Sequence, residues 1–254
     1  MKREAANDII FLFLVEFEAK QTITSYTGSI TDRALVQQAC RGVDIVLHIA
    51  SMIDWSLFPN RKILHEVNIL GKQIRTIAIL PLPMYGELDY ITIPLSIRPF
   101  KGKTYPLVGR MTATLQYSYV GNTAMMFVKA AEAIPNNPAL GGQFFFAADD
   151  TPPDTLPGVM KPFLDLVGSR PSTWHIPYWF TMFMMFLFYC LLYIVRLFKT
   201  VNLPNLHFTF GSIAFLNTTF YVTYDKAKTL LGYEPIYDYD TSIRRSNTFY
   251  SKII

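Results

Sequence analysis

The chain has 254 residues, of which 51% are hydrophobic and 17% are charged, and its formal net charge is +4. Typical soluble domains are about 45–50% apolar and about 25% charged, so this composition predicts that some apolar surface meets lipid or a partner. The cations are scattered, which excludes a nucleic-acid surface and fits weak attraction to anionic lipid. Cys40 and Cys190 have no metal-ligand spacing. We therefore expect packed thiols, no disulfide framework and no metal site.

The first half of the chain alternates predicted strands and helices. Residues 22–27 predict a short strand, and residues 32–40 predict a helix that Gly42 ends. Residues 44–50 form an apolar run of the kind found in strands buried on both faces of a parallel sheet, and residues 60–71 predict a second helix. This strand–helix–strand–helix order is typical of a parallel sheet with helices covering its faces.

The second half opens on a stretch rich in Pro, Gly and Tyr, residues 77–108. The elements predicted after it are a helix at 119–133, a strand at 142–147, a turn at 149–153, a helix before Trp174, short strands within 208–220, and a terminal helix at 225–231 closed by Gly232.

Residues 171–195 contain no Asp, Glu, Lys or Arg, and residues 178–195 read YWFTMFMMFLFYCLLYIV. This run is at the lower end of the length that spans a hydrocarbon layer of roughly 30 Å. Its flanks suit a membrane interface, with Trp174, Tyr178 and Trp179 at one end and Tyr193, Arg196 and Lys199 at the other. The run is apolar all round, which argues against a buried core helix and against a helix lying in the interface plane. We expect membrane association, with spanning and shallow insertion both compatible with the sequence.

Several short motifs follow one another in a recognisable order. They are GSITD at 28–32, VLHIA at 46–50, NILG at 68–71, VGN at 120–122, GQFFFAADDTP at 142–152 and YDKAKTLLGYEP at 224–235. Together, from about Phe17 onward, they resemble the 3-beta-hydroxysteroid dehydrogenase/isomerase family of extended short-chain dehydrogenases. The joint order of the motifs carries the resemblance more than any single motif does.

The resemblance implies an α/β fold: an incomplete Rossmann-like parallel sheet with a C-terminal substrate-side lobe and one hydrophobic membrane helix. The implied regions are a partial NAD-binding region at 1–110, the substrate-side lobe at 111–173, the membrane-associated helix at 174–199 and a C-terminal segment at 200–254. The implied activity is NAD-dependent oxidation of a steroid 3-beta-hydroxyl in steroid metabolism. The implied location is a membrane, which we expect to be that of the endoplasmic reticulum.

The resemblance also implies roles for individual residues. His48, Ala50 and Asn68 would lie beside the cofactor, and His48 ends a predicted parallel strand, where α/β sheets bind ligands. Tyr119 and Asn122 would lie on the substrate side. Structural roles stay open beside these: a capped strand end for His48, a backbone hydrogen bond for Asn68 and a helix N-cap for Asn122.

The family's reaction moves a hydride from the steroid carbinol carbon to nicotinamide while a Tyr in a Tyr-x-x-x-Lys pair takes the hydroxyl proton. The Lys cation is needed because a Tyr with its ordinary pKa near 10 is a poor base. No GxGxxG or GxxGxxG precedes Gly28, so we expect the nucleotide-binding turn to be missing. Ser29 stands where the family has an acidic residue on the adenine side.

The catalytic region is also expected to be missing. Residues 78–87 resemble the family's later Leu-Arg-Pro-x-x-x-Tyr-Gly strand and loop, with Leu80 in place of Arg. One βαβ unit takes about 30 residues, so residues 72–79 leave no room for the Ser-bearing strand and the Tyr-x-x-x-Lys helix. We therefore assign no catalytic residue and predict that the chain does not bind NAD measurably.

The literal Tyr-x-x-x-Lys spacing from Tyr224 to Lys228 is interpreted as a chance match within the family's C-terminal helix, with Lys226 and Lys228 on its solvated face. Asp149 and Asp150 precede Thr-Pro-Pro and are interpreted as turn formers and not as an acid and a base.

Two hypotheses follow, and a third is disfavoured. The first is a steroid dehydrogenase whose catalysis is impaired in this chain. The alternative is a non-catalytic membrane-associated relative or truncated gene product. The apolar segment argues against the third, a dehydrogenase or epimerase of nucleotide sugars.

Overall fold

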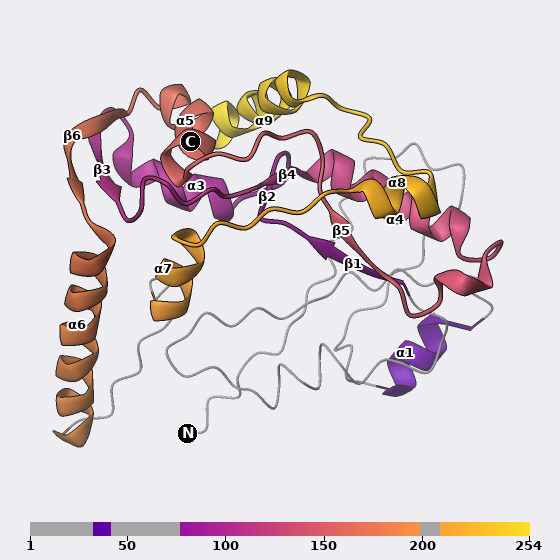
Figure 1. Cartoon of the computed structure of the whole chain (residues 1–254), viewed down its shortest axis with the longest axis horizontal. Helices are drawn as coiled ribbons and strands as arrows, with labels where there is room; N and C mark the ends of the chain where they lie inside the picture. Colours follow the sequence, from indigo (N-terminus) through magenta and orange to yellow (C-terminus); the bar gives the residue numbers. More distant parts are fainter. Residues whose placement is uncertain (1–32, 42–76, 199–208) are drawn as a thin grey trace. The chain divides into compact units, whose positions relative to one another are not determined.

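The computed structural model describes residues 33–41, 77–198 and 209–254 (Figure 1). The chain divides into two compact units, Met1–Asp54 with Phe58–Gln73, and Trp55–Leu57 with Ile74–Ile254. In the first unit the helix α1 (Arg33–Ala39) is described, and it confirms the helix predicted there. The other elements predicted before residue 77 lie outside the described residues, and so do His48, Ala50 and Asn68.

The second unit contains short strands and helices in alternation (Figure 1). The strands are β1 (Ala78–Pro81), β2 (Met84–Tyr85), β3 (Thr104–Val108), β4 (Ser118–Tyr119), β5 (Phe144–Ala147) and β6 (Arg170–Ile176). The helices are α3 (Thr92–Ile97), the 3-10 turn η1 (Arg98–Phe100), α4 (Val120–Ala133), η2 (Pro138–Leu140), α5 (Leu156–Leu166), α6 (Tyr178–Phe198), α7 (Phe210–Leu216), α8 (Asp225–Leu231) and α9 (Tyr239–Ile253).

Every strand pair among the described residues is parallel. β1 pairs with β5 from Ala78 opposite Phe144, β2 pairs with β4, and β3 pairs with β6. Parallel pairs need long crossovers, and the chain between β1 and β5 supplies one that includes α4. The predicted partial parallel sheet is confirmed here as three two-stranded ladders, together with the helices predicted at 119–133 and before Trp174 and the strand at 142–147.

The buried apolar side chains form two cores. The first joins β2 and β4 to α3, α5 and α9, with Tyr85, Ile97, Phe163 and Tyr250 among its members. The second joins β5, α4 and α8, with Phe145 at its centre. Burial of one such large side chain contributes about 1.5–3 kcal/mol. Because α8 and α9 each belong to a core, the C-terminal part of the chain is integral to this unit.

The segment between the apolar run and α8 differs from the prediction. The prediction of short strands within residues 208–220 is wrong, because the helix α7 occupies residues 210–216. Two reciprocal hydrogen bonds cap its N-terminus. The Thr209 backbone N–H donates to the Ser212 hydroxyl (2.7 Å), and the Ser212 N–H donates to the Thr209 hydroxyl (3.2 Å). Asn217 closes the helix by donating to the Ile213 carbonyl at 2.7 Å.

The helix α8 ends at Gly232 as predicted, with φ 63°, a conformation in which glycine is favoured. It is not terminal, however, because α9 follows. The Asp238 carboxylate accepts a hydrogen bond from the Thr241 N–H (2.7 Å) and so caps α9.

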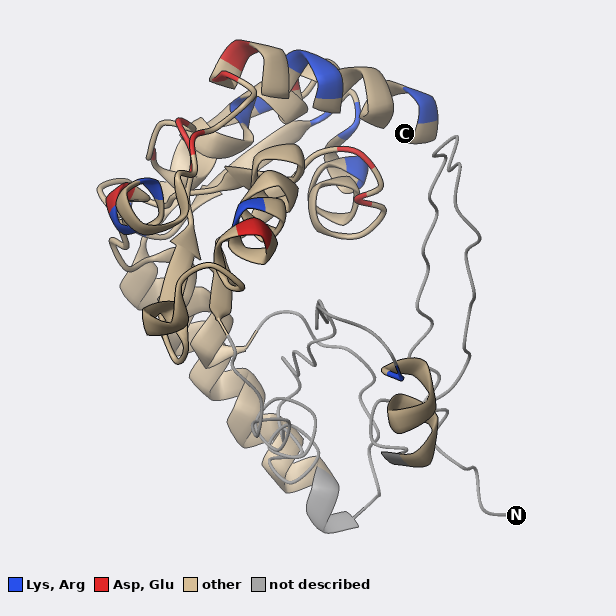
Figure 2. Ribbon diagram, turned by 90° about the vertical axis from the view of Figure 1, so that its right-hand side faces the viewer, with Lys and Arg blue, Asp and Glu red and all other residues tan. Residues whose placement is uncertain are grey.

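The helix α6 covers the predicted apolar run. From Tyr178 to Val195 it is long and apolar enough to cross a membrane by length and composition, with mean hydropathy 1.9. Most of its large side chains are exposed, whereas Met185 is buried. Figure 2 shows this stretch without a charged residue, whereas α9 carries both signs of charge.

Candidate functional site

The candidate site lies where two short parallel strands end. β2 and β4 align Tyr85 with Tyr119, Glu87 follows β2 after Gly86, and α4 starts directly after Tyr119. The carboxyl ends of parallel strands are the edge at which α/β folds place ligands. The general rule for α/β folds therefore makes this edge the candidate site.

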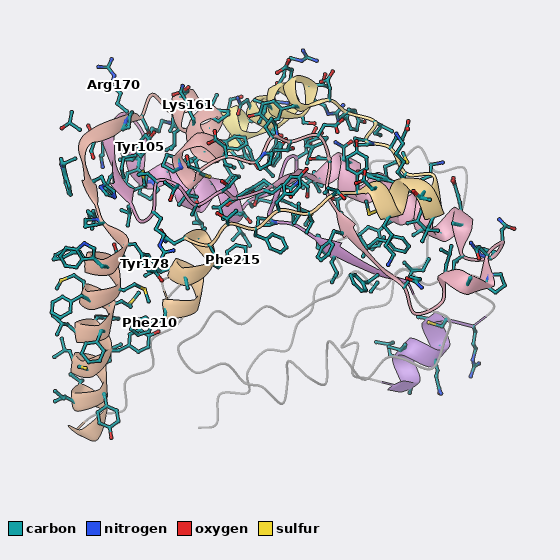
Figure 3. All side chains as sticks on the ribbon, in the orientation of Figure 1. Tyr105, Lys161, Arg170, Tyr178, Phe210 and Phe215 are labelled. Atoms are coloured by element: carbon teal, nitrogen blue, oxygen red, sulfur yellow. The ribbon has the colours of Figure 1, made fainter. Side chains whose placement is uncertain are left out.

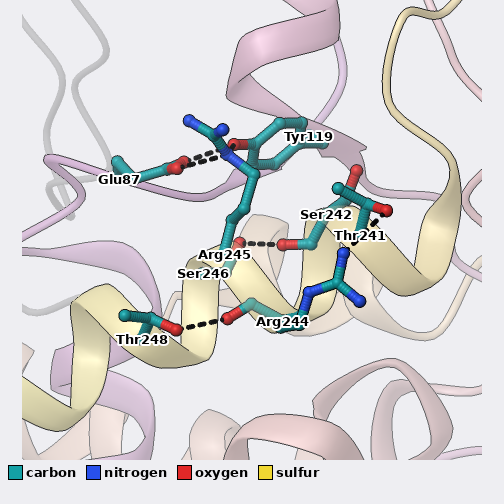
Figure 4. Close-up of polar contacts among 8 residues, drawn as sticks. All are labelled: Glu87, Tyr119, Thr241, Ser242, Arg244, Arg245, Ser246 and Thr248. Atoms are coloured by element: carbon teal, nitrogen blue, oxygen red, sulfur yellow. Dashed lines mark hydrogen bonds and ion pairs between the residues drawn. The ribbon is translucent and has the colours of Figure 1, made fainter.

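Three side chains form a polar cluster at this edge, which we call the Glu87 cluster: Glu87, Tyr119 and Arg245 (Figure 4). The Tyr119 hydroxyl donates to Glu87 Oε2 at 2.6 Å. Arg245 Nε donates to Glu87 Oε1 at 2.9 Å and to the Tyr119 hydroxyl at 2.8 Å. The Arg245 guanidinium also lies 4.8 Å from the centre of the Tyr237 ring.

Burial and the hydrogen bond to Glu87 raise the pKa of Tyr119 well above its ordinary value. A proton-abstracting tyrosine needs the opposite shift, since its phenolate must form near neutral pH. Tyr119 therefore keeps its proton and acts as a hydrogen-bond donor. Its placement on the substrate side stays a prediction.

Gly86 ties the site to the C-terminal helix. Its N–H donates to the Tyr250 hydroxyl at 2.9 Å, and that hydroxyl donates to Asp89 Oδ2 at 3.0 Å. Gly86 has φ 140°, and a Cβ there would lie 2.4 Å from Val120 Cγ1. No other residue type fits this position without a shift of the backbone or of α4.

Asn122 is buried and holds two segments together. Its Oδ1 accepts the N–H groups of Ile236 (3.1 Å) and Tyr237 (3.0 Å). Its Nδ2 donates to the Tyr237 carbonyl (2.9 Å) and to Asp149 Oδ2 (3.0 Å). The N-cap role considered for Asn122 is wrong, because α4 begins at Val120 and Tyr119 is its N-cap residue.

Asp149 accepts a backbone hydrogen bond at the start of α4, where the N-cap residue Tyr119 provides no side-chain cap. Its buried carboxylate accepts the Tyr119 N–H at 2.8 Å as well as the Asn122 amide, which suits the positive end of a helix. Its other oxygen accepts the Thr151 N–H at 3.0 Å, which confirms its interpretation as a turn former.

The Tyr224 and Lys228 pair does not fit a nicotinamide site. The Tyr224 hydroxyl donates to Asp150 Oδ1 at 2.9 Å, and burial together with this hydrogen bond raises the pKa of Tyr224 to about 12. Lys228 pairs with Glu234 at 2.9 Å and is exposed, as predicted. Lys226 is exposed as predicted too, and its ammonium donates to the Phe144 carbonyl of β5 at 2.8 Å. Neither lysine activates the phenol.

A cleft of about 380 Å³ opens beside the loop after β5, and most of the residues that line it are polar. They include Asp149, Asp150, Thr151, Thr223, Tyr224 and Asp225. A second cavity of about 40 Å³ lies beside Tyr85 and Phe163, and it has room for little more than water. Sites for lipid-like ligands are mostly apolar, so the cleft lacks the lining that a steroid requires, and the second cavity lacks the volume.

Glu87, Arg245 and Tyr250 are the residues of this site that the sequence did not single out. Glu87 directly follows the Tyr-Gly of the family-like loop, which is the signal that could have found it. Arg245 and Tyr250 lie on α9, so they could be found only once that helix was recognised.

The comparisons with known proteins agree with the motifs. The model of the 3-beta hydroxysteroid dehydrogenase/isomerase family matches residues 70–178. The mouse (Mus musculus) sterol-4-alpha-carboxylate 3-dehydrogenase, decarboxylating, is 29% identical over 195 residues, which are 74% of this chain and 53% of that protein. Human (Homo sapiens) 3 beta-hydroxysteroid dehydrogenase type 7 is 32% identical over 211 residues, covering 74% of this chain and 54% of that protein.

The chain spans about half the length of these curated relatives. Among solved structures, gox2253 has a TM-score of 0.51 at 15% identity, covering 75% of this chain and 56% of that one. This likeness concerns the fold, a Rossmann-like α/β arrangement. The ordered motifs, the family match and the two curated relatives identify the chain as a member of the 3-beta-hydroxysteroid dehydrogenase/isomerase family.

Proposed function

We propose that this chain is a membrane-associated relative of the NAD-dependent 3-beta-hydroxysteroid dehydrogenases that does not itself carry out hydride transfer. The substrate class of its family is supported by the curated relatives, whose names are those of a sterol dehydrogenase and a hydroxysteroid dehydrogenase. The complete activity would be oxidation of a 3-beta-hydroxyl on a steroid or sterol, with NAD as hydride acceptor.

One observation carries the proposed loss of catalysis. The strand β1 begins at Ala78 and pairs in parallel with β5, and the family-like NILG motif ends at Gly71. Only residues 72–77 lie between them. The Ser-bearing strand and the Tyr-x-x-x-Lys helix of an active relative need roughly a βαβ unit, about 30 residues.

The geometry of the described residues supports the same proposal. The one Tyr-x-x-x-Lys spacing in the sequence, Tyr224 to Lys228, has both functional groups bonded elsewhere. The phenol of Tyr119 is held protonated beside Glu87. Neither Tyr119 nor Tyr224 therefore has the lowered pKa that a proton-accepting phenol requires.

Membrane association is supported by α6, whose window Tyr178–Val195 is apolar and long enough to cross a membrane, with most of its large side chains exposed. A sterol partitions into membranes, so an apolar helix beside a sterol-class fold brings the protein to its ligand. We propose the endoplasmic reticulum as the membrane.

Turnover measurements test this function. The detergent-solubilised chain is mixed with NAD and a 3-beta-hydroxysteroid, and NADH formation is followed with the mouse relative as positive control. We expect no steroid-dependent NADH from this chain, and none from its Tyr224→Phe and Lys228→Met variants. Turnover that Tyr224→Phe abolishes would make Tyr224 the proton acceptor and overturn the proposal. Turnover that both variants keep would overturn it as well and place the acceptor on another residue.

A further inference from the structure

The start of α6 and the end of α7 are both attached to the same short stretch of the folded unit, Gly109 and Arg110. Immediately before α6, the Ile176 carbonyl accepts a hydrogen bond from the Gly109 N–H at 2.9 Å. Immediately after α7, the Asn217 side-chain oxygen accepts from the next N–H along, that of Arg110. The Arg110 guanidinium also lies 4.7 Å from the centre of the Tyr178 ring, at the first residue of α6 (Figure 3). The entry to α6 and the exit from α7 are therefore neighbours.

The two helices also contact each other. The Tyr189 and Phe210 rings lie 4.7 Å apart between centroids, and Figure 3 shows Phe210 on α7 near α6. Tyr189 lies midway along α6, so α7 begins beside the middle of α6 and ends where α6 started.

The chain after α7 stays with the folded unit. The Phe220 N–H donates to the Thr114 carbonyl at 3.1 Å, and the Val222 N–H donates to Gln116 Oε1 at 3.0 Å. Further on, α8 and α9 complete the two cores with elements that precede α6. A membrane that separated α8 and α9 from the elements before α6 would take both cores apart.

The surface of α6 fits lipid better than a protein. Met185 is buried on the stripe that also carries Tyr189, whose ring contacts α7. The rest of the helix surface is apolar and exposed, up to 69% for Trp179 and 70% for Tyr193, and an apolar surface with no polar face suits lipid. Residues 166–224 contain no Asp or Glu, and their cations are Arg170, Arg196 and Lys199. A segment with only positive charge beside an apolar helix suits anionic headgroups.

We propose that α6 and α7 form a one-sided membrane anchor, which enters lipid from the folded unit and returns to that same unit. Residues 77–176 and 218–254 then face the same side of the bilayer. This inference rests on the proposed membrane association. It excludes a single pass with the C-terminal segment on the far side.

Cysteine accessibility in sealed microsomes tests the anchor. In the full chain with Cys40→Ser and Cys190→Ser, single cysteines are placed by Ser96→Cys on α3 and Ser251→Cys on α9, both exposed and nearly isosteric changes. We expect a membrane-impermeant maleimide to label the two variants equally in intact microsomes, and to label them equally again after permeabilisation. Labelling of one variant only after permeabilisation would overturn the one-sided arrangement.

A matched pair of substitutions tests lipid contact. Leu187 on α6 and Leu95 on α3 are 44% and 50% exposed. We expect Leu187→Arg to weaken membrane partitioning on the order of 100-fold, because a central Arg is unfavourable in hydrocarbon, and Leu95→Arg to leave it unchanged. Equal retention of the two Arg variants in the membrane after carbonate extraction would overturn lipid contact by α6. Release of the unsubstituted chain by carbonate as a soluble oligomer would overturn it as well.

The outcomes separate the two claims. An unsubstituted chain that carbonate releases as a monomer would defeat the proposed membrane association and the anchor with it. Unequal labelling of a retained chain would defeat the anchor alone. The turnover measurement is independent of both.

Discussion

At Gly86, both the backbone conformation and the packing require a residue without a side chain. The residue has φ 140°, and an added Cβ would lie 2.4 Å from Val120 Cγ1. We predict that Gly86→Ala lowers the free energy of unfolding by about 2–4 kcal/mol, from left-handed strain together with overpacking. Gly102, with φ 67° and open space around its Cβ position, is the control. Gly102→Ala should cost only about 1–2 kcal/mol. Equal losses in chemical denaturation would contradict the packing argument.

The Glu87 cluster gives a second prediction at this scale. Glu87→Gln keeps the shape but removes the charge to which Tyr119 and Arg245 donate. We expect a loss of about 1 kcal/mol, near the low end for bonds to charged groups because Arg245 is half exposed.

Glu132→Gln is the control for this change, since its pair with Lys129 lies on the surface of α4. It should alter the free energy of unfolding by less than about 0.5 kcal/mol. Denaturation midpoints that move equally for both variants would show that the cluster adds nothing beyond a surface ion pair.

Single residues of the site were predictable only where they adjoin a predicted element. Tyr119 and Asn122 stand at the start of a helix that periodicity reveals, so they were found from the sequence. Glu87 and Arg245 are 158 residues apart, and nothing local marks them as partners. Their meeting depends on how α9 packs, which a single sequence does not report.

At the scale of elements, clear periodicity and clear stop signals decide what is predictable. In α4 the buried residues recur at helical spacing, Asn122, Met126 and Ala130, and α8 ends on a left-handed glycine. α7 is too short to show a period, and its cap uses Ser212 where Glu or Gln is usual. α9 turns Ser242 and Ser246 into the core, so its apolar pattern is diluted.

The attachment of α9 can be tested through one hydroxyl. Tyr250→Phe removes the acceptor of the Gly86 N–H and the donor to Asp89 and leaves the buried ring in place. We predict a loss of about 1–3 kcal/mol in the free energy of unfolding, because a buried N–H is left without a partner. Tyr90→Phe, at a ring that is half exposed, is the control and should change little. A neutral Tyr250→Phe would contradict the role given to this bond.

At the scale of the whole molecule, buried phenols set an alkaline limit to stability. Burial raises the pKa of Tyr117 to about 12, and it raises the pKa values of Tyr85 and Tyr250 well above the ordinary value. The unfolded chain would ionise these groups near pH 10. Their contribution to folding is complete below pH 10 and is lost as the pH rises toward 12.

We therefore predict alkaline unfolding that begins above about pH 10. Tyrosinate absorbance and far-ultraviolet ellipticity should then change together, since the buried phenols ionise as the fold opens. Full ionisation of all tyrosines at unchanged ellipticity would show that these side chains are not protected by the fold.

The account as a whole depends on whether the chain can hold the cofactor of its family. Under the proposed function, residues 72–77 leave no room for the catalytic region of an active relative. Calorimetric titration of the detergent-solubilised chain with NAD measures this directly, with the mouse relative as positive control. We predict no saturable heat for this chain. Saturable binding with one NAD per chain would contradict the account.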